Sequence, residues 1–216
     1  MPVRSYYEEI PWEEFILSRT PEYLRLCEQL ESLGFHPAAS SEIPTLNLDR
    51  YFTVFSHRTS TAIATLTSSV NAQKEELVLE FTQVYIGGMH LDVTNSPKPY
   101  LYPPWKQKRL YRAPRVSRPD ELYQLFTAIV EKVRDRKRTR LIQGRELEEI
   151  AQFSNNEIRQ LVRTGFLRLS TDGTTARCKL WSAYYMSWRL LLPLRAILNR
   201  LDERAAYTAA GRAVAR

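Results

Sequence analysis

The chain has 216 residues, of which 44% are hydrophobic and 25% are charged, as expected for a folded globular protein. Seven glycines, three histidines and two widely separated cysteines argue against a glycine-rich phosphate loop, a histidine-based metal site and a disulfide framework. The most apolar stretch, 180–198, contains Arg189, Pro193 and Arg195, which make a membrane span costly. We therefore expect a cytoplasmic protein without a transmembrane span, with peripheral attachment to a membrane as the alternative.

The charges are distributed unevenly along the chain. Residues 1–96 carry 6 Lys/Arg and 13 Asp/Glu, whereas residues 97–216 carry 25 Lys/Arg and 11 Asp/Glu. A basic C-terminal half of this kind predicts an anionic partner, which is nucleic acid, an acidic protein surface or anionic lipid. The alternative is that the two halves attract each other, within one chain or between subunits.

The first 96 residues show a helix followed by strand patterns. Thr20 and Pro21 predict the start of a helix, and Gly34 predicts its end. The alternating segments 50–70 and 76–95 predict antiparallel strands. A two-residue turn at Gly87-Gly88 would pair Tyr85 with His90 and Gln83 with Asp92. We expect an acidic helix-plus-antiparallel-sheet part over 1–96.

A proline-rich basic segment follows. Six of the 24 residues from Ser96 to Pro119 are prolines, and seven are Lys or Arg. We expect residues 97–119 to form a connector or an edge strand, because a central strand does not tolerate so many prolines. The basic part 120–216 is then mostly helical and contains a short hairpin. The predicted fold class is α+β.

The segment 119–181 resembles a winged helix-turn-helix module. The order is an amphipathic helix from 119, a helix over 144–153, a second helix over 154–165, and a hairpin turned at Asp172-Gly173. The resemblance implies that the helix around 156–163 is a recognition helix. Its outward face would carry Asn156, Arg159, Gln160 and Arg163, which are residue types that read base edges.

The hairpin adds two cations to this candidate surface. Its turn places Arg168 directly opposite Arg177, and like charges in that position destabilise a sheet. A bound phosphate or carboxylate would relieve the repulsion; the alternative is that both side chains extend into water. The predicted anion- or nucleic-acid-binding residues are Asn156, Arg159, Gln160, Arg163, Arg168 and Arg177.

A second candidate surface lies further along the chain. The segment after residue 180 combines aromatic, leucine and arginine residues, which are typical of a membrane interface. The alternative is a helix that packs on its own protein. The predicted membrane or partner surface consists of Trp181, Tyr185, Trp188, Arg189, Leu191 and Arg195.

Catalytic signals are few. His90 and Asp92 share one face of the predicted sheet, which is a geometry for a general base or for two metal ligands. No nucleophile elbow, phosphate-binding loop, zinc-protease motif or cysteine cluster occurs in the sequence. We therefore expect no catalytic residues, no metal and no cofactor. The leading hypothesis is a non-enzymatic binding protein; an adaptor and a small enzyme at His90/Asp92 are the alternatives.

Overall fold

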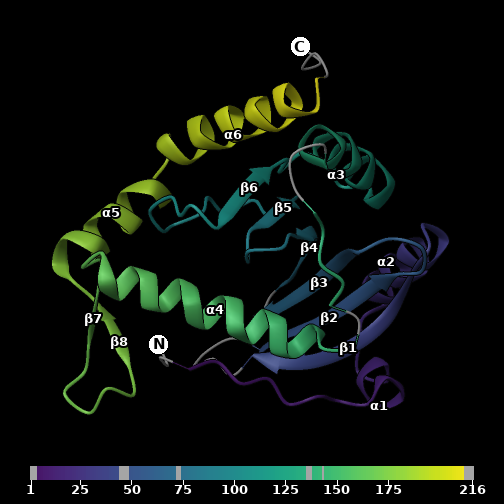
Figure 1. Cartoon of the computed structure of the whole chain (residues 1–216), viewed down its shortest axis with the longest axis horizontal. Coiled ribbons are helices and arrows are strands. Elements are labelled where there is room, and N and C mark those ends of the chain that lie inside the picture. The colour runs from purple at the N-terminus through teal and green to yellow at the C-terminus, as the bar shows by residue number, and fades with distance from the viewer. Residues whose placement is uncertain (1–3, 44–48, 72–73, 135–137, 143, 212–216) are drawn as a thin grey trace.

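The computed structural model describes residues 4–43, 49–71, 74–134, 138–142 and 144–211 and has the predicted α+β fold (Figure 1). The helices are α1 (Trp12–Ile16), α2 (Pro21–Ser32), α3 (Pro119–Arg134), α4 (Glu146–Arg163), α5 (Leu180–Leu190) and α6 (Leu194–Ala210). The strands are β1 (Phe35–Ile43), β2 (Asp49–His57), β3 (Ala62–Asn71), β4 (Lys74–Val84), β5 (His90–Thr94), β6 (Lys108–Arg112), β7 (Leu167–Leu169) and β8 (Ala176–Cys178).

Strands β1 to β6 form one sheet in sequence order. Neighbours from β1 to β5 are antiparallel, whereas β5 and β6 are parallel. Strand β6 comes from the proline-rich segment, for which we expected a connector or an edge strand, and it lies at one edge of the sheet. A parallel neighbour needs a long return connection, and residues 95–107 supply it.

Helix α2 begins where the sequence predicted. The hydroxyl of Thr20 accepts a hydrogen bond from the backbone N–H of Tyr23, and Pro21 occupies the first helical position. Tyr23, Cys27 and Leu30 are buried against the sheet. The four-residue spacing of Tyr23 and Cys27 and the three-residue spacing of Cys27 and Leu30 put all three on one helix face.

The predicted register of the β4–β5 turn is wrong by one residue. The structure pairs Val84 with His90 and Thr82 with Asp92. Ile86 is 63% exposed and joins Gly87 and Gly88 in a three-residue loop, whereas the prediction placed it in the strand. A shift of one residue exchanges the faces of a strand, so Thr82 takes the place expected for Gln83.

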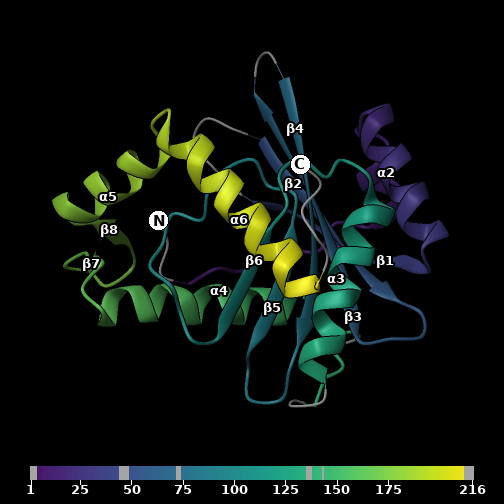
Figure 2. The same cartoon turned by 90° about the horizontal axis from the view of Figure 1, so that it is seen from above.

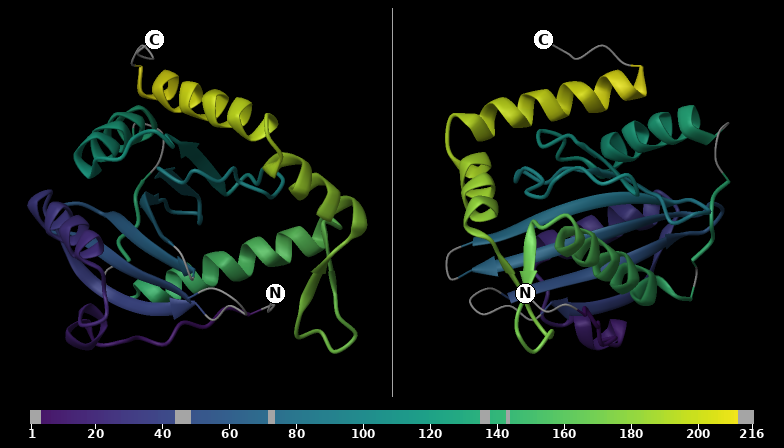
Figure 3. Two further views of the ribbon diagram at one scale, coloured as in Figure 1. Left: turned by 180° about the vertical axis from the view of Figure 1, so that it is seen from behind. Right: turned by 60° about the vertical axis from the view of Figure 1, so that its left-hand side comes forward.

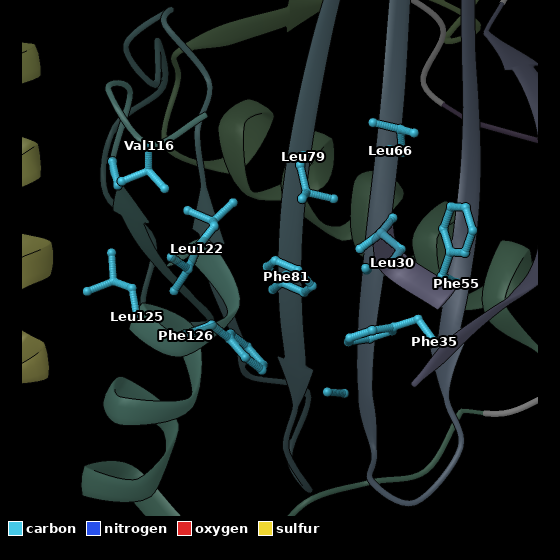
Figure 4. Packing of buried hydrophobic residues seen from close by; sticks show 14 of the residues in the cluster. Leu30, Phe35, Phe55, Leu66, Leu79, Phe81, Val116, Leu122, Leu125 and Phe126 are labelled. Carbon is cyan, nitrogen blue, oxygen red and sulfur yellow. The ribbon is translucent and has the colours of Figure 1, made fainter. Parts of the chain in front are cut away.

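The sheet buries apolar side chains on both faces. On one face, Phe81 lies between Phe35 and Phe126, with ring centroids 5.4 and 5.7 Å away (Figure 4). This face is covered by α2 and α3. The opposite face carries Val54 and Ile63, which pack with Ile150 of α4. Helices α3 and α4 therefore cover opposite faces of the sheet (Figure 3).

Helix α4 is continuous, whereas the sequence predicted two helices separated near 153–154. Tertiary contacts keep the residues of the expected break helical. Phe153 stacks on His90, with ring centroids 3.8 Å apart, and the Asn155 amide exchanges hydrogen bonds with the backbone of Ser5. Because α4 has no turn and α3 lies across the sheet, the helix-turn-helix arrangement does not form.

A small separate core joins the C-terminal elements. Phe166 and Leu167 are buried with Ile158 and Leu161 of α4, and Met186 of α5 packs against them. The β7–β8 hairpin and α5 therefore lie at the end of the molecule remote from α2 (Figure 2). Among the described residues, no helix is both long enough and apolar enough to cross a membrane.

Candidate functional site

The outward face of α4 carries the four predicted polar residues together. Asn156, Arg159, Gln160 and Arg163 line an open groove of about 730 Å³. The loop residues Pro104, Trp105, Lys106 and Gln107 form its other wall. The Arg159 guanidinium donates a 2.7 Å hydrogen bond to the Asn156 side chain. The three-to-four spacing predicted from the sequence thus gives one polar, cationic surface.

The hairpin has the predicted register. Arg168 is paired with Arg177 across β7 and β8, and both side chains are exposed. The Asp172 carboxylate instead accepts hydrogen bonds from the hydroxyl and the backbone N–H of Thr174 inside the turn. In the part of the chain that the structure describes, no carboxylate forms an ion pair with Arg168 or Arg177.

Helix α5 has one side attached to the protein and one side open to solvent. On the attached side, the Ser182 hydroxyl donates a 2.6 Å hydrogen bond to the backbone oxygen of Phe166. On the open side, four large side chains recur every three or four residues, and each is more than half exposed. These are Trp181, Tyr184 and Trp188 of α5 and Leu191, which directly follows the helix.

The apolar surface continues into the α5–α6 connection, where Leu192 is 79% exposed. The other three residues predicted for this surface face inward. Tyr185 packs against Phe166, Arg189 donates to the Tyr185 hydroxyl, and Arg195 donates to the backbone oxygen of Pro97. We call the exposed surface of Trp181, Tyr184, Trp188, Leu191 and Leu192 the α5 apolar face.

A third feature is a cavity of about 170 Å³ between α4 and the sheet. His90 and Asp92 both line it, because their two-residue spacing puts them on one face of β5. Lining residues from other elements are Ile63, Thr65, Glu80, Thr82, Lys108, Glu149, Ile150, Phe153, Ser154 and Glu157. The Thr82 hydroxyl donates a 2.7 Å hydrogen bond to Asp92, and the Lys108 ammonium lies 3.4 Å from the Glu157 carboxylate.

Burial determines the protonation of this cavity. It raises the pKa of Glu80 and of Asp92, and the charge of Asp92 raises the pKa of Glu80 further. Burial, with the charges of Lys108 and Arg140, lowers the pKa of His90 to about 3. The imidazole is therefore neutral at physiological pH. Among the described residues, no group of three or more His, Cys, Asp and Glu side chains is placed to hold a metal ion.

Sequence reasoning missed four charged residues of the cavity. They are Glu80 on β4, Lys108 on β6, and Glu149 and Glu157 on α4, so only the tertiary fold brings them to His90 and Asp92. A usable signal existed for Glu80, because Glu80 and Thr82 are two residues apart and therefore lie on the same face of one strand.

Comparisons with protein-family models, with curated proteins and with solved structures found no match to this chain.

Proposed function

We propose that the protein is a non-enzymatic binding protein that docks on an anionic lipid surface through its C-terminal part. The observation that carries the proposal is the α5 apolar face. Contiguous exposed apolar surface is unusual on a soluble monomer and is typical of a binding surface. Ser182 and Phe166 fix the orientation of α5, so this face is presented to solvent by the fold itself.

The charge of the same region favours an anionic surface. Residues 158–201 contain eight Lys/Arg and one acidic residue, Asp172. Lys179 immediately precedes α5, Arg177 lies on the adjacent strand, and both are exposed. A cation close to an anionic bilayer contributes about 1 kcal/mol, and each apolar methylene that enters the interface contributes about 0.8 kcal/mol. The two contributions act together on this surface.

Nucleic acid is the second candidate partner. The groove on α4 combines guanidinium, amide and indole groups, which contact phosphates and stack on bases. This candidate accounts for Arg159 and Arg163 but leaves the α5 apolar face in water. Lipid binding places both the apolar side chains and the neighbouring cations in favourable surroundings, and for that reason we prefer it.

The experiment compares flotation with vesicles of phosphatidylcholine alone and vesicles that also contain phosphatidylserine, at low and high salt. We expect binding to the anionic vesicles, with part of it retained at high salt because apolar insertion is not screened. The double variant Trp188→Ser/Leu191→Ser should lose this binding. Leu17→Ser, which changes an 85% exposed leucine on the N-terminal part, is the control.

A gel-shift titration with duplex DNA tests the second candidate. Binding through phosphates would weaken steeply with salt, by about 0.9 in log affinity per log salt for each phosphate contact. Arg159→Glu/Arg163→Glu would abolish it. Tight, salt-sensitive DNA binding combined with no vesicle binding would show that the partner is nucleic acid and that the α4 groove is its binding site.

A further inference from the structure

The cavity beneath α4 is independent of lipid docking, because none of its lining residues belongs to α5 or α6. It contains more carboxyl groups than cations. Glu149 is balanced by an ion pair with Arg140. The remaining carboxyl groups, Glu80, Asp92 and Glu157, share one cation, the Lys108 ammonium, which lies 3.4 Å from Glu157 and whose charge also acts on Asp92 and Glu80. Buried carboxylates are normally paired, so one ammonium cannot balance three carboxyl groups unless some of them hold protons.

Two almost fully buried side chains keep free hydrogen-bonding atoms. His90 is 6% exposed, and among the described residues its ring nitrogens accept and donate no hydrogen bond; Nε2 lies 3.6 Å from the Glu149 carboxylate. Asp92 is 2% exposed, and one of its two carboxylate oxygens accepts from Thr82. The other oxygen has no hydrogen-bond donor in the described part of the chain. Among the described residues, neither His90 nor Asp92 has a fully enclosed side-chain atom without a partner, so their free atoms open onto the cavity, where an occupant can pair with them.

Most of the free atoms can accept a hydrogen bond. The unprotonated imidazole nitrogen of His90, the second oxygen of Asp92 and, once it is ionised, the Glu80 carboxylate can each accept an N–H. The cavity already holds one ammonium group in this manner. Lys108 Nζ lies 3.4 Å from Glu157, 4.8 Å from the Tyr100 ring centroid and 5.3 Å from that of Phe153. Ammonium, with several N–H donors and affinity for aromatic faces, matches these surroundings.

The volume limits the size of the ligand. About 170 Å³ corresponds to roughly five or six water molecules at about 30 Å³ each. We propose that the cavity binds a small primary ammonium ion, with Asp92 and Glu80 as its counter-charges and His90 as an additional acceptor. The incoming cation replaces protons on the two carboxyl groups, so binding releases protons and tightens as the pH rises. Glu149 and Glu157 of α4, Lys108 of β6 and the nearby Arg140 stay in their present pairs.

Isothermal titration calorimetry with the full chain tests the proposal. The probes are the methylammonium-to-butylammonium series, with propanol as the neutral control and propionate as the anionic control. Titrations in two buffers of different ionisation enthalpy count the protons released. We expect saturable binding of one ammonium ion, proton release, tighter binding at higher pH, and no binding of propanol or propionate.

Variants separate a ligand site from a structural cluster. Asp92→Asn and Glu80→Gln should each weaken ammonium binding at least tenfold, and the free protein should be as stable as wild type or more stable. Glu148→Gln is the control, because Glu148 is exposed on α4 and paired with Arg145. Absence of saturable binding across the ammonium series, or equal binding of propanol, would overturn the proposal. So would a Glu80→Gln variant that binds normally and is destabilised.

Discussion

The Ser182 hydroxyl donates a hydrogen bond to the backbone oxygen of Phe166, and this contact fixes the rotation of α5 about its axis. The Phe166 ring is fully buried and makes edge-on contacts with Trp181 and Tyr185 of α5. One side of α5 is thereby attached to the small C-terminal core. The α5 apolar face lies on the exposed side, and Trp181, which is half exposed and also contacts Phe166, lies at its border.

Phe166→Ala should destabilise the C-terminal elements. Removing a fully buried phenylalanine ring leaves a cavity and typically costs about 3–5 kcal/mol. The measurement is urea unfolding followed by tryptophan fluorescence, with amide exchange of 158–190 as a local probe. Leu169→Ala is the control, because Leu169 is 43% exposed and its loss should change stability by less than about 0.5 kcal/mol. Equal effects of the two changes would contradict the role given to Phe166.

Arg177→Glu should stabilise the hairpin and weaken vesicle binding at the same time. A glutamate opposite Arg168 replaces a repulsive cross-strand pair by an attractive one, which is worth about 0.2–1 kcal/mol. Vesicle binding should fall because a cation beside α5 becomes an anion. Urea midpoints and flotation measure the two effects. Arg58→Glu makes the same charge change at an exposed residue after β2 and should leave vesicle binding unchanged.

The neutral state of His90 predicts a loss of stability in acid. Its pKa is lowered to about 3 in the folded protein, whereas an unfolded histidine titrates near 6.5. Between these values the unfolded chain binds the extra proton, so stability falls by up to about 1.4 kcal/mol per pH unit as the pH decreases. The raised pKa of Glu80 changes stability in the opposite direction. The informative quantity is therefore the difference in the free energy of unfolding between wild type and His90→Gln at each pH.

We expect His90→Gln to gain stability relative to wild type as the pH falls from 6.5 towards 4. Denaturant unfolding at a series of pH values measures the difference. The His90 Cε1 resonance provides a direct check, because it should not titrate between pH 8 and 5. A resonance that titrates near 6.5 would show that the imidazole is solvated.

Asp202→Ala should loosen α6. The Arg112 guanidinium is 2% exposed and bonds to Asp202, to Asn199 and to the backbone oxygen of Ser96. Removing one partner of a buried pair costs about 3–5 kcal/mol, and partial exposure of Asp202 reduces this to about 2–3 kcal/mol. Arg204→Ala, an exposed change on the same helix, should be neutral within about 0.5 kcal/mol. Thermal and urea unfolding distinguish the two outcomes.

Features encoded by neighbouring residues could be predicted from the sequence. The Thr20-Pro21 start of α2 and the pairing of Arg168 with Arg177 each depend on a few adjacent positions. The outward face of α4 follows in the same way from helical spacing. The exposure of Trp188 and Leu191 could not be decided, because the same pattern fits a helix packed on its own protein.

Features decided by distant contacts could not be predicted. Ser154-Asn155 has the composition of a helix start, but Asn155 bonds to Ser5, 150 residues away, and the helix continues through it. The β4–β5 register depends on whether Ile86 pairs or enters the loop, and Gly87-Gly88 permits both. The shared face of His90 and Asp92 could be predicted but the cavity could not, because Lys108 and Glu157 come from elements whose positions no local pattern specifies.

The most direct measurement concerns the depth of Trp188 in a bilayer. In a variant with Trp12, Trp105 and Trp181 changed to Phe, all tryptophan emission comes from Trp188. If the α5 apolar face enters the membrane, phosphatidylserine-containing vesicles should shift this emission to shorter wavelength, and brominated acyl chains should quench it. Emission that is neither shifted nor quenched, from protein that floats with the vesicles, would contradict insertion of this face.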